Sequence, residues 1–319
     1  MSIDDLVLVG DPHLGRKFEM GVPLARRGER EQMQLEDFVR AIAQPGKVVV
    51  VVGDLFDHPY VSYAVLKQAA EALLREARER PDVMFYVMAG NHDMPRNITA
   101  IGAFDIVTMV LSGRLPNLWV VKQPIIADGL AMFPWEWDVS ALDQLPREPR
   151  SDVYAVIGHW DLKSFGGSDR HLAPVARLRE LFGDVPIYSG HFHVPGEYAL
   201  AGGSVLCTGS LQPYAHDQDP DGTLYVTLTR SEAMQRTDLR DKNVRVLLEP
   251  GEGLPELDCL SLTHTRKAAA IDEGASWSAP TPVTFDWQKT LASKLDPLDP
   301  VVRTFITERI PDYERRSAE

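Results

Sequence analysis

Cysteine, long apolar runs and positive charge are all scarce in this sequence. Only two of its 319 residues are cysteine, Cys207 and Cys259, and their spacing matches no zinc or redox motif. No apolar stretch approaches the roughly 20 residues that a membrane-spanning helix needs. The first apolar run starts at Leu6, which leaves no room for a signal peptide. These absences predict a cytoplasmic protein with reduced cysteines and no membrane span.

The charge balance is strongly acidic. Lys and Arg number 33 against 46 Asp and Glu, which gives a formal net charge of −13. A protein that binds nucleic acid by itself usually presents a basic surface, so this balance disfavours tight DNA binding by the chain alone. It leaves room for a local basic patch, a phosphate bridged by metal ions, or a partner that supplies the affinity. Acidity of this kind is also common among soluble cytosolic proteins.

Helical patterns alternate with short apolar runs. Amphipathic or Ala/Leu-rich segments predict helices at Glu29–Gln44, Tyr63–Arg80 and Ala173–Phe182. The runs between them are apolar throughout, which is typical of strands buried on both faces by helices, and the alternation indicates an α/β architecture. Segments 197–210 and 222–229 are expected to be shorter strands that extend the same sheet.

Five apolar runs close with a glycine that is followed at once by a polar residue. In open α/β sheets, functional groups collect at the carboxyl ends of strands, and glycine permits a sharp turn there. We therefore expect the five tips to converge, because five polar strand ends without a shared purpose would be a large coincidence. With two nearby histidines, the converging side chains are Asp11, His13, Asp54, Asn91, His159, His191 and His193.

This set of ligands indicates a pair of divalent metal ions. It offers oxygen and imidazole but no thiolate, which suits Mn²⁺, Fe or Zn²⁺. Phosphate-cleaving sites hold two such ions about 3.5–4 Å apart, and one carboxylate must bridge them. Asp54 is the best candidate for the bridge.

The motifs "DPH", "GDLFD", "GNHD", "GH" and "GHFH", in this order, resemble those of the calcineurin-like metallophosphoesterase superfamily over about the first 195 residues. The resemblance implies a sandwich of two mixed β-sheets flanked by helices, with a small C-terminal accessory domain. It also implies that His92 is the acid that protonates the leaving oxygen, with Asp57 orienting it, and that Asp93 is structural. One metal would be held by Asp11, His13, Asp54 and His193, and the other by Asp54, Asn91, His159 and His191.

The segments "DPHLGRKF", "GDLFDHPYVSYAVLK" and "VLCTGSLQPYAHDQDPDG" resemble SbcD-type DNA-repair and recombination nucleases. This implies a two-metal DNA exo- or endonuclease that hydrolyses phosphodiester bonds and uses Mn²⁺, with Fe or Zn²⁺ as alternatives. It further implies a homodimer that works with an SbcC-like, SMC-type ATPase subunit. Basic residues beside the first motif are expected to contact the DNA backbone, with a solvated loop as the alternative. They are Arg16, Lys17 and Arg27, with Arg26 and Arg30 in the same stretch.

Two other functions compete with a nuclease. A small-molecule phosphodiesterase or nucleotide hydrolase could use the same dinuclear site, and it fits the acidic balance more easily because it needs no DNA groove. A non-catalytic scaffold that kept the fold is disfavoured, because such proteins lose ligands and this chain retains all seven.

The composition changes after residue 228. Segments 243–250 and 257–264 are expected to be strands, and Phe285–Arg309 one or two helices interrupted by proline. The Gly-plus-polar motif does not recur there. We therefore predict a catalytic domain over residues 1–228 and an accessory domain over residues 229–319.

A further motif, "DQDPDG" at Asp217–Gly222, matches the start of a calcium-binding loop. The twelfth position of that loop is Leu228 here, where the ion needs a bidentate glutamate. A hairpin turn is the better prediction. In the same way, the aromatic stretch Met132–Ser140 is expected to cover a sheet edge, with stacking on bases as the alternative.

Overall fold

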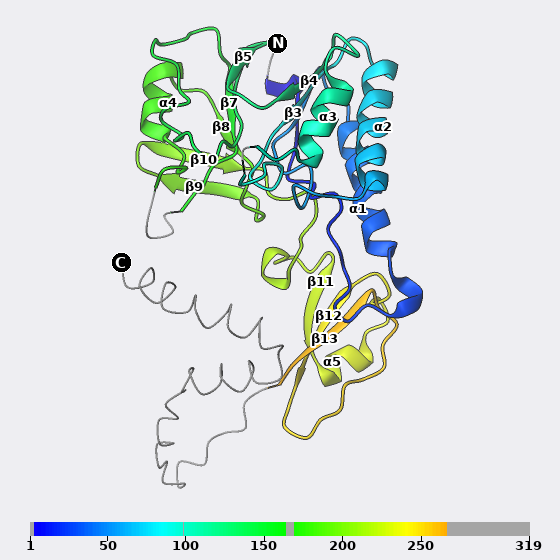
Figure 1. Cartoon of the computed structure of the whole chain (residues 1–319). Coiled ribbons are helices and arrows are strands. Elements are labelled where there is room, and N and C mark those ends of the chain that lie inside the picture. Colours follow the sequence, from blue (N-terminus) through cyan, green and yellow to red (C-terminus); the bar gives the residue numbers. More distant parts are fainter. Residues whose placement is uncertain (1–2, 98, 164–168, 267–319) are drawn as a thin grey trace, which may run out of the picture. The chain divides into compact units, whose positions relative to one another are not determined.

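The computed structural model describes residues 3–97, 99–163 and 169–266. The described residues all belong to the first of the two compact units into which the chain divides, Met1–Lys267. Two sheets dominate this unit (Figure 1). The four-stranded sheet has the order β1-β2-β3-β4 and is parallel at every pairing. Its strands are β1 (Leu6–Val9), β2 (Val48–Val51), β3 (Met84–Met88) and β4 (Leu118–Val121).

The second sheet has six strands in the order β5-β6-β7-β8-β10-β9. Its two outer pairs are antiparallel and the inner ones parallel, so this sheet is mixed. Segment 197–210 thus extends a sheet, as its pattern predicts. The strands are β5 (Ile125–Ala127), β6 (Leu130–Phe133), β7 (Ala155–Gly158), β8 (Ile187–Ser189), β9 (Gly196–Leu200) and β10 (Gly203–Cys207).

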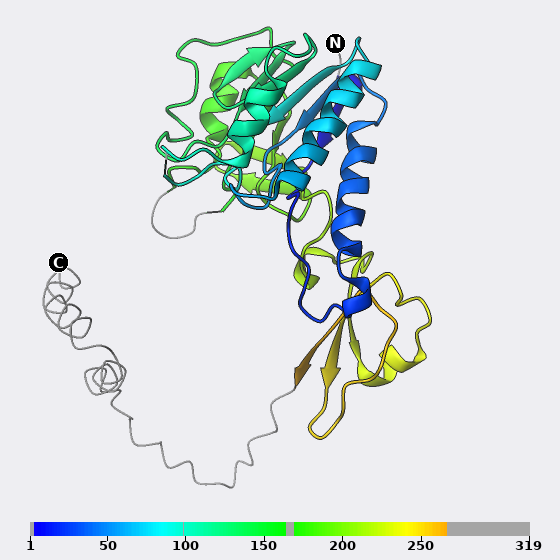
Figure 2. The ribbon, with the colours of Figure 1, turned by 45° about the vertical axis from the view of Figure 1, so that its right-hand side comes forward.

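Three apolar layers hold the sheets and helices together. The middle layer lies between the two sheets, where valines of β2 meet Met132 and Ile157 of β6 and β7. The outer face of the four-stranded sheet packs against α1 (Glu29–Ile42), α2 (Tyr63–Glu79) and α3 (Ala103–Leu111). The outer face of the six-stranded sheet packs against α4 (Val175–Phe182). Figure 2 shows α1, α2 and α3 on one side of the sandwich.

The sequence explains these layers. All four valines of β2 are buried, and burial of a valine side chain stabilises the fold by roughly 1.5–3 kcal/mol. Helix α2 begins where the Ser62 hydroxyl accepts a hydrogen bond from the amide of Val65, a cap that satisfies an otherwise free donor. The three predicted helices are present, each within two residues of its expected bounds. Among the described residues, no helix is long and apolar enough to cross a membrane.

A third sheet corrects two predictions. Segment 222–229 does not extend either sheet of the sandwich, because β11 (Tyr225–Thr229) pairs in parallel with β12 (Asn243–Leu248) and this with β13 (Ser261–Arg266). The "DQDPDG" segment therefore connects two sheets and is not a hairpin. The Asp219 carboxylate closes this turn by accepting hydrogen bonds from the amides of Thr223, Leu224 and Tyr225.

One face of this third sheet is apolar and the other polar. Valines of β11 and β12 pack against α5 (Arg230–Gln235). The domain boundary at residue 228 stays a prediction, although the third sheet already begins at Tyr225. The helices predicted for Phe285–Arg309 lie outside the described residues.

Candidate metal centre

The seven predicted ligands follow the carboxyl ends of five strands from two different sheets. Asp11 and His13 follow β1, Asp54 follows β2 and Asn91 follows β3, all in the four-stranded sheet. The three remaining histidines come from the facing sheet. His159 follows β7, whereas His191 and His193 follow β8. The middle apolar layer aligns the two sheets, so that the polar tips meet at one edge of the sandwich.

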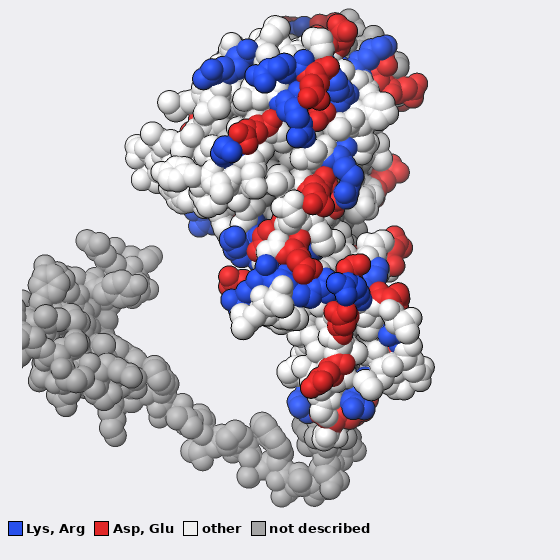
Figure 3. Space-filling view, turned by 90° about the vertical axis from the view of Figure 1, so that its right-hand side faces the viewer, with Lys and Arg blue, Asp and Glu red and all other residues white. Residues whose placement is uncertain are grey.

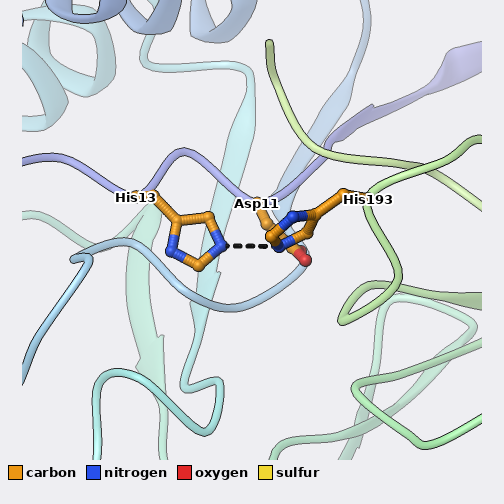
Figure 4. Close-up of side chains that lie close together, drawn as sticks. All are labelled: Asp11, His13 and His193. Carbon is orange, nitrogen blue, oxygen red and sulfur yellow. Dashed lines mark hydrogen bonds between the residues drawn. The ribbon is translucent and has the colours of Figure 1, made fainter. Parts of the chain in front are cut away.

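The first cluster contains Asp11, His13 and His193, whose ligand atoms all lie within 4.8 Å of one another. The Nε2 atoms of His13 and His193 face each other at 3.0 Å, with the Asp11 carboxylate beside them (Figure 4). Asp11 Oδ1 is buried and has no hydrogen-bond partner in the part of the chain that the structure describes. Two imidazoles and a buried carboxylate aimed at one point are the donor set of a divalent cation.

The second cluster contains Asn91, His159 and His191. The side-chain oxygen of Asn91 lies 3.0 Å from His159 Nε2 and 2.8 Å from His191 Nδ1. Asp54 joins the two clusters, because its Oδ2 atom lies 3.4 Å from His159 Nε2 and 3.6 Å from His13 Nε2. One carboxylate oxygen within reach of both clusters is what a bridging ligand requires.

The electrostatics fit a pair of cations. Asp11 and Asp54 are fully buried close together, and burial raises the pKa of Asp11 well above its ordinary range. Burial alone would raise the pKa of Asp54 too, but the neighbouring His159 and His13 outweigh it and lower that pKa. A pair of buried carboxylates is costly without positive charge between them. The donor set, the burial and the unpartnered oxygen of Asp11 therefore fit two divalent cations.

The surroundings shift the pKa values of the predicted histidine ligands in different directions. Burial lowers the pKa of His193 to about 4 and also lowers that of His13, so both rings are neutral near pH 7, as metal ligation requires. Burial alone would lower the pKa of His159 as well, but the carboxylates of Asp54 and Asp11 raise it to about 9. A cation bound by these carboxylates would take the place of that proton.

Three ligands have strained backbones. Among the described residues, four non-glycine residues have positive φ, and three of them are His13 (46°), Asp54 (48°) and His191 (77°). Left-handed backbone costs a non-glycine residue about 1–3 kcal/mol and persists only where the surroundings enforce it. The strain is concentrated on three of the seven predicted ligands, which indicates that their positions are set for function.

The glycines before the ligands make room for ligands of other strands. A Cβ atom on Gly90 would overlap the Asp54 carboxylate, and one on Gly53 would overlap the ring of His159. At Gly190 the same atom would lie 2.5 Å from Asp11 Oδ1. Three of the five Gly-plus-polar motifs therefore interlock, since Gly53, Gly90 and Gly190 each leave space that a predicted ligand from another strand end fills.

Gly90→Ala is expected to weaken metal binding and to destabilise the fold by about 1–3 kcal/mol, because the added methyl group displaces Asp54. Denaturant unfolding and a metal titration measure the two effects. Gly253→Ala is the matched control, because a Cβ there meets nothing within 4 Å. Equal stability of both variants would contradict the interlocking arrangement.

Asp57 acts differently from the prediction. His92 is held by the main-chain carbonyl of Asp57, which lies 2.6 Å from His92 Nδ1, and not by its carboxylate. The carboxylate turns instead to His13 Nδ1 (3.5 Å) and to the guanidinium of Arg16 (3.0 Å). Since His13 Nε2 points into the first cluster, Asp57 orients His13 through its carboxylate and His92 through its backbone carbonyl.

Asp93 has the structural role predicted for it. Its carboxylate accepts hydrogen bonds from the amides of Leu55, Phe56 and Gly90. It therefore ties together the turns that follow β2 and β3. These turns carry Asp54 and His92, so Asp93 fixes the positions of these two residues relative to each other.

The prediction from sequence missed one carboxylate. Asp161 Oδ1 lies 2.9 Å from His191 Nε2, while His191 Nδ1 faces Asn91. A histidine that binds metal through one nitrogen is usually oriented by an acceptor on the other. The only sequence signal was its position two residues after His159, in "GHWD".

Asp161→Asn is expected to lower the affinity of the second metal site about 10–100-fold, because an amide orients the ring of His191 less strongly than a carboxylate does. Calorimetric titration with Mn²⁺ measures this. Asp152→Asn, at an exposed ion pair with Arg150, is the control with the same change of charge. An affinity equal in both variants would show that Asp161 does not position His191.

The aromatic stretch Met132–Ser140 brings one ring to the metal centre. Trp135 is buried, and its ring stacks on His171 at 4.2 Å and on His191 at 5.3 Å between centroids. Trp135 therefore packs against a predicted ligand, and the covering of a sheet edge by the stretch stays a prediction.

The predicted phosphate-binding residues divide into three kinds. Arg26 and Arg30 are structural: Arg26 pairs with Glu29 and Asp241, and Arg30 is buried against the side chain of Gln212. Arg27 is exposed, and no contact among the described residues joins it to the ligands. Arg16 and Lys17 remain candidates, because Arg16 reaches the metal centre through Asp57.

Comparisons with known proteins agree with this geometry. A family model for the calcineurin-like phosphoesterase domain matches residues 5–195, which contain all seven ligands and His92. The chain is also similar to the DNA double-strand break repair protein Mre11 of Archaeoglobus fulgidus, with 24% identity over 196 residues. This match covers 55% of the chain and 43% of that protein, so the chain spans less than half the length of this curated relative.

Proposed function

Since the chain belongs to the calcineurin-like phosphoesterase family, we propose that its metal centre hydrolyses phosphodiester bonds of DNA. The observation that carries the proposal is the pair of ligand clusters that share Asp54. Two divalent ions bound there would lower the pKa of water and neutralise charge on phosphoryl oxygens. The protein's own contribution is to hold the ions, to position the phosphate and to supply a proton.

His92 is placed to supply that proton. A main-chain carbonyl only accepts hydrogen bonds, so its contact with His92 Nδ1 requires the proton to lie on that nitrogen. When the ring carries a second proton, that proton lies on Nε2, and the imidazolium can give it to the leaving oxygen and keep the proton on Nδ1. The ring lies edge-on to His13 with 4.8 Å between centroids, and this proximity to the first cluster supports the proposed role.

The DNA assignment rests on the resemblance to SbcD-type nucleases and on the similarity to Mre11, whose name describes repair of double-strand breaks. We propose Mn²⁺ as the native ion, with Fe or Zn²⁺ compatible with the same ligands. We further propose a homodimer and an SbcC-like, SMC-type ATPase partner. The exposed apolar side chains of Tyr63 on α2 and Met109 on α3 would suit an interface, and a partner would explain how an acidic chain binds DNA.

A small-molecule phosphodiesterase is the second candidate. The net charge of −13 favours it, because a nucleotide or another small diester needs no extended basic surface. The metal ligands and His92 would serve the same roles, so the two candidates differ only in what lies around the centre.

One experiment separates the candidates. The purified chain is incubated with bis(4-nitrophenyl) phosphate and with end-labelled single- and double-stranded DNA, with Mn²⁺ or with EDTA. A DNA nuclease degrades the labelled DNA only with Mn²⁺. Hydrolysis of the chromogenic diester with intact DNA would support the second candidate, and no hydrolysis of either substrate would contradict both.

A further inference from the structure

A cavity of about 270 Å³ adjoins the metal centre on the side of the third sheet. Its walls are the segment 16–22, which follows the first motif, the segment 214–216, and the polar face of β11–β13. In the register of the sheet, Tyr225 lies beside Asn243 and Ser261, and Arg245 lies beside Thr263. All five of these side chains line the cavity, so three strands present one polar surface to it.

The cavity contains two cations that the protein leaves unpaired. Within the described residues, Lys17 and Arg245 form no ion pair or side-chain hydrogen bond, whereas Arg26 and Arg30 are held by partners. The one carboxylate in the lining is Glu19. Figure 3 shows that the acidic and basic side chains are interspersed on the face it presents. An excess of positive charge in one cavity of a chain with net charge −13 indicates an anionic ligand.

Two residues are shared between the wall of the cavity and the surroundings of the metal centre. The ring of Tyr214 lines the cavity and lies edge-on to His13 (5.2 Å) and His193 (5.5 Å), both in the first cluster. Arg16 also lines it, lies 4.8 Å above the Tyr214 ring and bonds to the Asp57 carboxylate. An anion in the cavity is therefore a near neighbour of a phosphate on the metals.

We propose that this cavity binds a nucleotide of a single strand next to the scissile bond, with Lys17 and Arg245 on its phosphate. The inference rests on the proposed function and adds the third sheet to the substrate site. The size of the cavity supports a single strand, because it lies near the lower end of small-molecule sites, at about 300 Å³, and is too small for a duplex. Asn243, Ser261 and Thr263 supply polar groups that can bond sugar or base.

The test measures binding of a fluorescein-labelled single-stranded oligonucleotide by anisotropy between 50 and about 200 mM salt. The parent is His92→Ala, so that cleavage does not interfere. Arg245→Gln is expected to weaken binding about tenfold or more, since a hydrogen bond to a charged group contributes about 1.5–3 kcal/mol. It should also reduce the salt slope by about 0.7, the value for one phosphate contact on a single strand.

Two further variants make the result interpretable. Lys17 is exposed, so Lys17→Gln probes the cavity without disturbing the sheet and should show the same two changes. Arg266→Gln is the matched control, because Arg266 lies on β13 outside the lining and, among the described residues, its side chain bonds only the carbonyl of Glu252. Binding unchanged in both cavity variants, or reduced equally by the control, would overturn the proposal.

Two parallel readouts separate the sources of failure. Titration with inorganic phosphate distinguishes free phosphate from a strand: weaker phosphate binding with unchanged oligonucleotide binding would contradict the inference. Cleavage of the same oligonucleotide by the wild-type chain with Mn²⁺ tests the proposed function by itself. Oligonucleotide binding that depends on Arg245 without any cleavage would overturn the proposed function and leave the cavity assignment standing.

Discussion

An Asp54→Asn variant is expected to lose metal-dependent hydrolysis and to keep a stable metal-free fold. In the wild-type chain one oxygen of Asp54 faces both clusters, so the substitution removes the bridge and half of the charge that holds two cations. The amide retains an oxygen to accept the hydrogen bond from the His92 amide, which Asp54 Oδ1 accepts at 2.8 Å. It also removes a buried charge close to Asp11 and Asp93, both of whose pKa values are raised in part by Asp54.

Thermal unfolding with and without Mn²⁺ measures this prediction. A ligand at 100 times its dissociation constant stabilises the folded state by about 2.7 kcal/mol, which raises the Tm of a 319-residue protein by about 4 °C. Wild-type protein should show this rise, and Asp54→Asn should show little or none from a similar starting Tm. A variant that keeps both the full rise and its hydrolysis would remove Asp54 from the metal centre.

His92→Ala should lower DNA hydrolysis about 10²–10⁴-fold, the usual contribution of general acid catalysis, while metal binding is retained. The ring is half-buried and contacts the protein through Nδ1, so its loss leaves the ligand clusters in place. The effect should depend on the leaving group. A sugar oxygen needs a proton to leave, whereas 4-nitrophenolate leaves without one, so hydrolysis of bis(4-nitrophenyl) phosphate should fall far less.

His58→Ala is the matched control for this variant. His58 is mostly exposed and bonds the Asp57 carboxylate at 3.0 Å, within 6.5 Å of the His92 ring. The His58→Ala variant should hydrolyse DNA and bis(4-nitrophenyl) phosphate at rates near those of the wild type. Equal losses on both substrates in His92→Ala would show that His92 positions the ions or the substrate. If His58→Ala instead loses hydrolysis of DNA far more than hydrolysis of bis(4-nitrophenyl) phosphate, His58 and not His92 would be the acid.

The strand tips could be predicted because their chemistry is local. A buried strand that stops at a glycine and a ligand carries that signal within three residues, as at Gly53-Asp54 or Gly90-Asn91. The division of these tips between two sheets has no such signal, because fully apolar strands look alike in either sheet. That part of the fold came from the resemblance to a family. The structure confirms a sandwich of two sheets flanked by helices, but the four-stranded sheet is parallel throughout and only the six-stranded sheet is mixed as predicted.

The predictions from sequence differ from the structure where a residue's partner is far away in the sequence. Arg26 and Arg30 look like free cations beside the first motif, but their partners Asp241 and Gln212 lie more than 180 positions later. The residue pattern of β11 is compatible with a strand in any of the sheets. Only its observed pairing with β12 assigns β11 to the third sheet. For Asp57 the residue was identified but the contacting atom was not, because side chain and carbonyl cannot be told apart in a sequence.

The central claim is that the seven side chains hold two metal ions with Asp54 between them. Anomalous diffraction from a crystal soaked in Mn²⁺ tests it most directly. We predict two peaks about 3.5–4 Å apart, one against Asp11, His13 and His193 and the other against Asn91, His159 and His191. A single peak, or none at this edge of the sandwich, would contradict the account.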